Sequence, residues 1–174
     1  GVPLIVDPVM VAKGGARLLD KDAHDALVLR LLPLASLLTP NVPEAEVLTG
    51  MRITKPSDLE RAADALLGLG PSAVLMKGGH LEGDVVIDLL RTADGEQHRF
   101  ESPRIRSRST HGTGCTLASG IAAGVAEGLT LHAAVARARQ FVLKAIEHAP
   151  GLGRGHGPLE FAHLLLPTQP AARR

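Results

Sequence analysis

Short apolar runs that alternate with helical patterns restrict this 174-residue chain to a small set of folds. Residues 2–6, 36–39 and 73–77 are mainly apolar, as expected of strands in a parallel sheet that is covered on both faces. The helical patterns between and after these runs cover residues 21–32, 43–48, 57–69, 113–127 and 131–148. Because strands that are separated by helices pair in parallel, we predict an α/β fold with a mostly parallel sheet.

Local signals predict where the elements begin and where the chain reverses. The expected N-cap residues are Asp20, Ser57 and Thr130, and Glu60 would complete a capping box at Ser57. Residues 93–95, Ala-Asp-Gly, lie between two strand-like segments at 85–91 and 97–101. A glycine after an aspartate at such a position is typical of a hairpin turn. We therefore expect an antiparallel hairpin at one edge of the sheet.

Composition excludes several classes of function. The formal net charge is +1 and aromatic residues make up only 2% of the chain, so a nucleic-acid-binding surface is not expected. No apolar run is long enough to cross a membrane. The single cysteine excludes an internal disulfide and a cysteine-based zinc site, and it is typical of a protein in the reducing cytoplasm.

The most informative local feature is a glycine-rich turn that leads into a helix of small residues. Residues 109–116 read Ser-Thr-His-Gly-Thr-Gly-Cys-Thr, and an alanine- and glycine-rich helical run follows them. Unpaired amides and the positive end of a helix dipole would together form an anion site, which phosphate commonly fills. A thiolate is stabilised at a helix N-terminus, so Cys115 could accept a proton there. This combination favours phosphoryl transfer to a hydroxyl, although glycines before a helix are as often only a tight loop.

Polar residues follow each of the three predicted parallel strands. Asp7 follows the first strand, Thr39 and Glu44 follow the second, and Lys77 ends the third. Ligands of open α/β sheets bind beyond the carboxyl ends of the strands, so these side chains should meet. Carboxylates, a hydroxyl and a lysine are what magnesium and a triphosphate require. Each residue also has an alternative as a turn former, a helix-dipole partner or a surface charge.

Four segments together resemble one family of kinases. They are residues 7–15 (Asp-Pro-Val-Met-Val-Ala-Lys-Gly-Gly), 39–45 (Thr-Pro-Asn-Val-Pro-Glu-Ala), 73–80 (Ala-Val-Leu-Met-Lys-Gly-Gly-His) and 109–117 (Ser-Thr-His-Gly-Thr-Gly-Cys-Thr-Leu). This set is similar to hydroxymethylpyrimidine/phosphomethylpyrimidine kinase of thiamine biosynthesis. The resemblance implies a ribokinase-like α/β fold with helices on both faces of the sheet. It also implies that ATP and Mg²⁺ are used to phosphorylate 4-amino-5-hydroxymethyl-2-methylpyrimidine and then to convert its monophosphate to the diphosphate.

The same resemblance implies a role for each candidate residue. The anion hole would be Gly112, Thr113 and Gly114, with Cys115 as the base on the acceptor side and Val9 against the pyrimidine. ATP would be bound by Asp7, Lys77, Glu44, His111, Gly155 and His156, and magnesium by Thr39 and Glu44, the latter two through water. For the histidines, a purely structural role is an equal alternative, and Cys115 could instead be an inert buried helix residue.

The resemblance also predicts the extent and state of the protein. We expect residues 1–166 to be the C-terminal part of one kinase domain that lacks its N-terminal third, with residues 167–174 as a tail. The intact protein would be a cytoplasmic homodimer, and the isolated chain would bind nucleotide poorly and turn over little. A pyridoxal kinase of the cysteine-bearing kind and a non-catalytic ligand-binding or regulatory piece are the alternatives.

Overall fold

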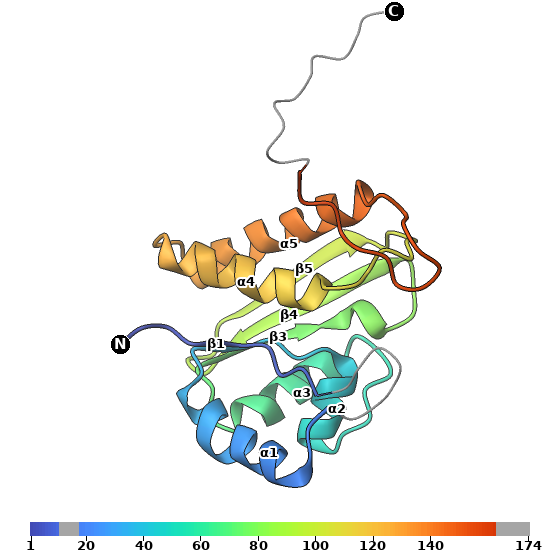
Figure 1. Cartoon of the computed structure of the whole chain (residues 1–174). Coiled ribbons are helices and arrows are strands. Elements are labelled where there is room, and N and C mark those ends of the chain that lie inside the picture. The colour runs from blue at the N-terminus through green and yellow to red at the C-terminus, as the bar shows by residue number, and fades with distance from the viewer. Residues whose placement is uncertain (11–17, 163–174) are drawn as a thin grey trace, which may run out of the picture.

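The computed structural model describes residues 1–10 and 18–162, which form one sheet between two layers of helices (Figure 1). The strands are β1 (Ile5–Val6), β2 (Leu37–Leu38), β3 (Ala73–Lys77), β4 (Val85–Thr92) and β5 (Gln97–Pro103). The α-helices are α1 (Lys21–Ala26), α2 (Val42–Thr49), α3 (Asp58–Leu67), α4 (Thr113–Ala126) and α5 (Leu131–Glu147). Helices α1, α2 and α3 lie on one face and α4 and α5 on the other, as the α/β prediction requires.

The sheet is mixed rather than mostly parallel in the described residues. Its strand order is β1-β2-β3-β4-β5, with β1, β2 and β3 parallel and with β4 and β5 antiparallel to their neighbours. The predicted hairpin is confirmed, and Gly95 in its turn has a positive φ of 95°. Because this hairpin joins the sheet directly at β3, it accounts for two of the four strand pairings.

Strands β1 and β2 are shorter than the apolar runs predict. The Leu4 amide donates to the side-chain oxygen of Ser36, and the Leu4 carbonyl accepts from the Ser36 amide. This local exchange replaces the regular ladder before β1 and leaves two paired residues in each strand. Strand β3 has the predicted limits.

The alternation of side chains along β3 divides the core in two. Val74 and Met76 pack against the layer of α1, α2 and α3, whereas Ala73 and Leu75 pack against α4 and α5. Side chains of a strand point alternately to the two faces, so one apolar run serves both layers. This packing fixes the end of β3, where Lys77 lies.

The helix expected over residues 21–32 is confirmed only in its first part. Asp20 is its N-cap and accepts a hydrogen bond from the Ala23 amide, as predicted. After α1 the helix first widens in the π-helical turn η1 (Leu27–Leu31) and then tightens in the 3-10 turn η2 (Leu32–Leu34). Pro33 in η2 has no amide hydrogen, so it cannot donate the hydrogen bond that would continue the α-helix.

The predicted capping box at Ser57 and Glu60 is wrong. Ser57 has a helical backbone and its side chain makes no capping hydrogen bond. The Asp58 carboxylate accepts instead from the amides of Thr54 and Lys55. A complete capping box occurs in α2, where the Asn41 side chain accepts from the Glu44 amide and the Glu44 carboxylate accepts from the Asn41 amide.

The two C-terminal helices agree with their predicted limits to within one residue. Thr130 caps α5 by accepting from the Ala133 amide. Helix α4 begins after Gly112, whose φ of 83° lies in the left-handed region that favours glycine. The predicted tail at 167–174 lies outside the described residues, and so does the part of the kinase-like segment 7–15 that follows residue 10. Within residues 1–10 and 18–162, no helix has the length and apolar character that a bilayer crossing requires.

Candidate active site

Asp7, Thr39 and Lys77 meet at the carboxyl ends of the three parallel strands. The Lys77 Nζ donates to Asp7 Oδ1 at 2.8 Å, and the Thr39 hydroxyl donates to the same oxygen at 2.9 Å. The side chains of Lys77 and Asp7 are only 13% and 14% exposed. The predicted convergence of the three strand ends is therefore confirmed.

The glycine turn before α4 offers a row of free backbone donors. No described residue accepts a hydrogen bond from the amides of Gly112, Thr113, Gly114 or Cys115, and the first amide with a partner is that of Thr116. These amides belong to the first turn of a 14-residue helix, so the helix dipole adds to their positive potential. The turn can therefore hold an anion.

The turn at residues 112–115, called the anion turn below, adjoins the cluster of Asp7, Thr39 and Lys77 at Gly114. A Cβ built on Gly114 would lie 3.2 Å from the Lys77 Nζ and 3.5 Å from the Asp7 Oδ2. Any residue larger than glycine would crowd the ammonium group. The structure thus brings a lysine cation next to Gly114, in a turn whose four amides have no partner among the described residues. This is a suitable arrangement for binding a phosphate chain.

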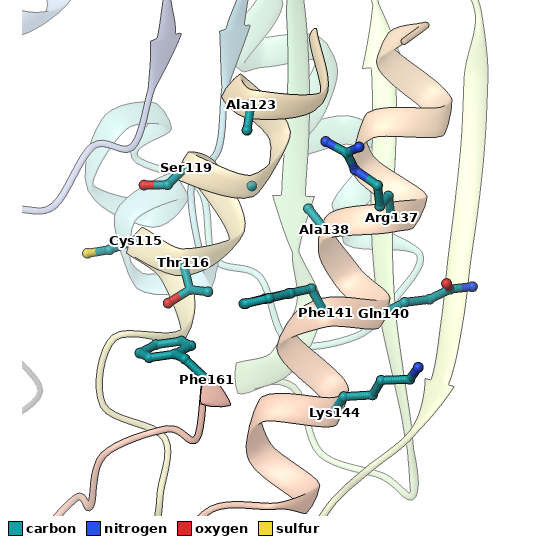
Figure 2. Close-up of a pocket in the computed structure, with 11 residues that line it drawn as sticks. Cys115, Thr116, Ser119, Ala123, Arg137, Ala138, Gln140, Phe141, Lys144 and Phe161 are labelled. Atoms are coloured by element: carbon teal, nitrogen blue, oxygen red, sulfur yellow. The ribbon is translucent and has the colours of Figure 1, made fainter. Parts of the chain in front are cut away.

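Cys115 occupies the first turn of α4 and is exposed. Figure 2 shows its side chain pointing to the side of α4 that faces away from α5. The alternative that Cys115 is a buried helix residue is therefore wrong. Its sulfur is accessible beside the anion turn, as a proton acceptor for a bound hydroxyl would have to be.

Glu44 is buried close to the cluster, but its position depends on α2. Its Oε2 accepts from the Asn41 amide at 2.8 Å, and no described residue other than Asn41 donates to its carboxylate. Burial raises the pKa of the Glu44 carboxyl above its ordinary value, although the Asn41 hydrogen bonds and the charge of Lys77 oppose this. A buried carboxylate with a single donor residue is a reasonable ligand for a cation.

Thr39 contacts Asp7 in the structure, and its role toward magnesium stays a prediction. Its side chain is completely buried, and its hydroxyl already donates to Asp7. This hydrogen bond orients the Asp7 carboxylate. Among the described residues, no group of three or more His, Cys, Asp or Glu side chains could hold a metal ion. A magnesium ion here would need phosphate oxygens and water to complete its coordination.

Of the two predicted nucleotide-binding histidines, His111 lies directly before Gly112, whereas His156 lies on a separate loop that is attached to this turn. The His111 amide donates to the Gly157 carbonyl at 3.2 Å, and the His156 ring lies 3.5 Å from the Thr110 hydroxyl. Both histidine side chains are exposed, and a Cβ on Gly155 would meet nothing within 4 Å. The structure places this group beside the anion turn. No contact in the described residues links the group directly to Lys77.

Val9 is exposed two residues after Asp7, and its amide donates to the Asp7 carbonyl. Its side chain is therefore available to a ligand at this edge. The contact with a pyrimidine stays a prediction.

A cleft of about 740 Å³ begins at Cys115 and extends between the outer faces of α4 and α5 (Figure 2). Its floor consists of small residues such as Gly120 and Ala138, and Phe141 and Phe161 stack with ring centroids 6.1 Å apart at one end. The cleft has the size of a small-molecule site. Sequence patterns do not predict it, because it depends on the close packing of two helices.

Three structural features near the site are also missing from the sequence-based predictions. Asn41, which holds Glu44, matches the capping-box pattern and could have been found by it. The Arg104 guanidinium donates to the carbonyls of Gly79, Leu81 and Gly83, so the segment after Lys77 is anchored. A buried ion pair of Asp88 and Arg139 lies next to β3, and no local pattern could reveal a pair 51 residues apart.

The family model for phosphomethylpyrimidine kinase matches residues 1–160. The chain is 53% identical over 163 residues to the thiamine biosynthesis bifunctional protein ThiED of Geobacter sulfurreducens, covering 93% of this chain and 32% of that protein. It is 45% identical to the hydroxymethylpyrimidine/phosphomethylpyrimidine kinase of Haemophilus influenzae, covering 89% of this chain and 59% of that enzyme.

Among solved structures, the chain is similar to pyridoxal kinase from Staphylococcus aureus in complex with AMP-PCP and pyridoxal. The TM-score is 0.82 and the identity 30%, and the match covers 91% of this chain and 57% of that one. The ribokinase-like α/β fold is thus confirmed. The chain spans less than two thirds of the length of each of these relatives.

Proposed function

We propose that this chain, which belongs to the phosphomethylpyrimidine kinase family, carries the phosphate-binding and proton-accepting part of a kinase site. The reaction would transfer the γ-phosphoryl group of ATP to the hydroxymethyl oxygen of 4-amino-5-hydroxymethyl-2-methylpyrimidine. A second transfer would convert the resulting monophosphate to the diphosphate. The observation that carries this proposal is the group of amides at 112–115, which have no partner within residues 1–10 and 18–162. They lie beside the Lys77 ammonium and the exposed Cys115.

The proposed step forms one bond and breaks one bond. The substrate hydroxyl oxygen bonds to the γ-phosphorus, the bond from that phosphorus to the bridging oxygen breaks, and ADP leaves. The Cys115 thiolate accepts the hydroxyl proton, while the amides of Gly112, Thr113 and Gly114 stabilise the charge on the transferred group. The transition state is loose and makes little demand on the nucleophile, so proton acceptance should contribute about 10²–10⁴-fold.

Lys77 would bind the nucleotide phosphates, with Asp7 and the buried Thr39 hydroxyl keeping its ammonium in place. Glu44 is the residue that best fits magnesium, because its buried carboxylate has no donor other than Asn41 in the described part of the chain. When bound, magnesium would neutralise phosphate charge as the leaving group departs. His111, Gly155 and His156 would form the nearby nucleotide loop, and Val9 would contact the pyrimidine.

Phosphorylation of pyridoxal is the second candidate, supported by the similarity to a pyridoxal kinase that was solved with pyridoxal. The greater identity to the pyrimidine kinase of H. influenzae, 45% against 30%, favours the pyrimidine. The proposed partners are the small-molecule pyrimidine substrate and ATP. The intact protein is proposed to be a homodimer located in the cytoplasm.

Nuclear magnetic resonance can test phosphate binding directly, even when binding is weak. On titration with ATP and magnesium, we expect the amide signals of residues 112–115 to shift most, because they are the unpaired donors. AMP, which lacks the β- and γ-phosphates, is the matched ligand and should shift them far less. Equal shifts with AMP, or no shifts with ATP, would contradict the proposed phosphate site.

Transfer of radiolabelled phosphate from ATP then tests the reaction in the intact protein, because this chain alone is expected to turn over little. We expect label on the hydroxymethylpyrimidine and less on pyridoxal, with transfer lowered at least about tenfold by Cys115→Ala. A smaller loss would mean that the thiol positions the substrate rather than accepting its proton. Faster labelling of pyridoxal would favour the second candidate.

A further inference from the structure

Asp88 in β4 and Arg139 in α5 form a buried ion pair that the proposed reaction does not use. Arg139 Nε donates to Asp88 Oδ2 at 2.7 Å, and each side chain is only 10% exposed. The guanidinium also lies over the Phe100 ring, 5.4 Å from its centroid. A buried ion pair adds little net stability because both charges lose hydration, so stability alone is a weak explanation for it.

The other oxygen of Asp88 holds the backbone just after Lys77. Asp88 Oδ1 accepts from the Gly78 amide at 2.9 Å, where β3 ends and the 3-10 turn η3 (Gly78–His80) begins. The backbone is tightly packed there, since a Cβ on Gly78 would lie 2.0 Å from the Ile87 carbonyl oxygen. With Arg139 on one oxygen and Gly78 on the other, the Asp88 carboxylate has donors at both oxygens.

Lys77 and Asp88 are direct partners in the antiparallel ladder of β3 and β4. Side chains of directly opposed residues lie on the same face, with Cβ atoms about 5 Å apart. Lys77 nevertheless pairs with Asp7, beside Gly114 and the anion turn. Asp88 is thus a second carboxylate within reach of the Lys77 side chain, and Arg139 occupies it.

We propose that Arg139 is a positioning residue which, by occupying Asp88, keeps the Lys77 ammonium paired with Asp7 next to the phosphate-binding amides. This inference rests on the proposed role of Lys77 in phosphate binding. Arg139 itself contacts no substrate. When Arg139 is removed, Asp88 attracts Lys77 away from the anion turn, and nucleotide affinity falls.

The test is a charge-rescue series in the full chain, with ATP and magnesium affinity as the readout. We expect Arg139→Gln to weaken binding about tenfold, as for loss of one charged partner at a buried site. Adding Asp88→Asn to this variant removes the competing charge and keeps an oxygen for the Gly78 amide, so affinity should return to within about threefold of wild type. Arg139→Lys keeps a cation at Asp88 and should bind like the wild type.

Arg99→Gln is the matched control, because it removes an arginine from an exposed ion pair with Glu101 on the neighbouring strand β5. It should leave affinity unchanged. The inference is overturned when the double variant binds ATP no better than Arg139→Gln. Because removing both charges also relieves a purely structural ion pair, recovery of affinity supports the positioning role only together with the Lys77 signal described next.

A readout without nucleotide separates this inference from the proposed function. The Lys77 ammonium signal in nuclear magnetic resonance should respond to Asp88→Asn strongly in the Arg139→Gln background and weakly in the wild type. A wild-type chain that binds no ATP would refute the proposed phosphate site, and this signal would then decide the positioning role. An equal response in both backgrounds would overturn it.

Discussion

The two aspartates on either side of Lys77 are almost equally buried but have different surroundings. Asp88 has donors at both oxygens, from Arg139 and from the Gly78 amide. Asp7 shares one oxygen between Lys77 and Thr39, and its other oxygen faces Gly114 of the anion turn. Lys77 in turn lies next to amides that have no partner in the described residues.

The difference shows that burial alone does not distinguish a functional charge from a structural one. The Asp88 pair has 10% exposure on each side and the Asp7 pair has 13% and 14%. What separates them is whether every neighbouring donor and acceptor is satisfied. A satisfied pair can fix geometry, whereas a pair next to unpaired amides can exchange partners with an incoming anion.

Removing the cation from each pair should separate the two roles most strongly. Arg139→Met leaves the buried carboxylates of Asp88 and Asp7 with Lys77 as their one counter-charge among the described residues, so we expect the free energy of unfolding to fall by about 3 kcal/mol. Lys77→Met should cost only about 1 kcal/mol, because Asp7 keeps the Thr39 hydroxyl and lies near unpaired amides. Urea denaturation of both variants measures this. Equal losses would mean that the two pairs have the same structural role.

The attachment of the histidine loop to the anion turn allows a second, smaller test. A Cβ on Gly157 would lie 2.7 Å from the Ser109 Oγ and 2.8 Å from the Leu152 carbonyl oxygen, so this contact is filled. We expect Gly157→Ala to lower the free energy of unfolding by about 2 kcal/mol. The matched variant is Gly155→Ala, since nothing lies within 4 Å of its Cβ.

Gly155→Ala should change stability by less than about 0.5 kcal/mol. Thermal or urea unfolding of both variants checks the pair. Similar losses of unfolding free energy in the two variants would show that the cost comes from restricting the backbone of the loop. The contact with Ser109 would then not be its cause. In that case Gly78, and not Gly157, would be the position near the site where tight packing excludes a side chain.

The elements that sequence predicted well are those governed by local pattern. Strand β3 is a continuous apolar run, and α5 has a threonine cap and helical periodicity, so both have nearly their predicted limits. The meeting of Asp7 and Lys77 followed from a topological rule for parallel strands rather than from local signals.

The errors arose where two local signals competed or where tertiary contacts decide. Asn41 and Ser57 are each followed three residues later by a glutamate, and only Asn41 forms the capping box. At Ser57 the Asp58 carboxylate already accepts from the amides of Thr54 and Lys55, so the chain turns earlier. The pairing of Asp88 with Arg139 depends on how α5 lies across the sheet, which no local pattern specifies.

The smallest expected effect is on the pH dependence of stability, which tests the surroundings of Glu44 next to Asp7 and Lys77. Burial raises the pKa of the Glu44 carboxyl, so the folded protein holds this proton more tightly than the unfolded chain does. Between the ordinary glutamate pKa and the raised value, the folded state binds more protons, and its stability falls as pH increases. Glu44→Gln keeps an oxygen for the Asn41 amide but cannot titrate.

We therefore expect the stability of the wild type relative to Glu44→Gln to decrease as pH rises through that window and to be constant below it. Urea unfolding at a series of pH values measures the difference. A relative stability that increases with pH would mean that Lys77 and the Asn41 hydrogen bonds outweigh burial at Glu44. The Glu44 carboxylate would then be satisfied without a metal, as the Asp88 carboxylate is. The contrast between the satisfied Asp88 pair and the unsatisfied surroundings of Asp7 would then not extend to Glu44 in α2.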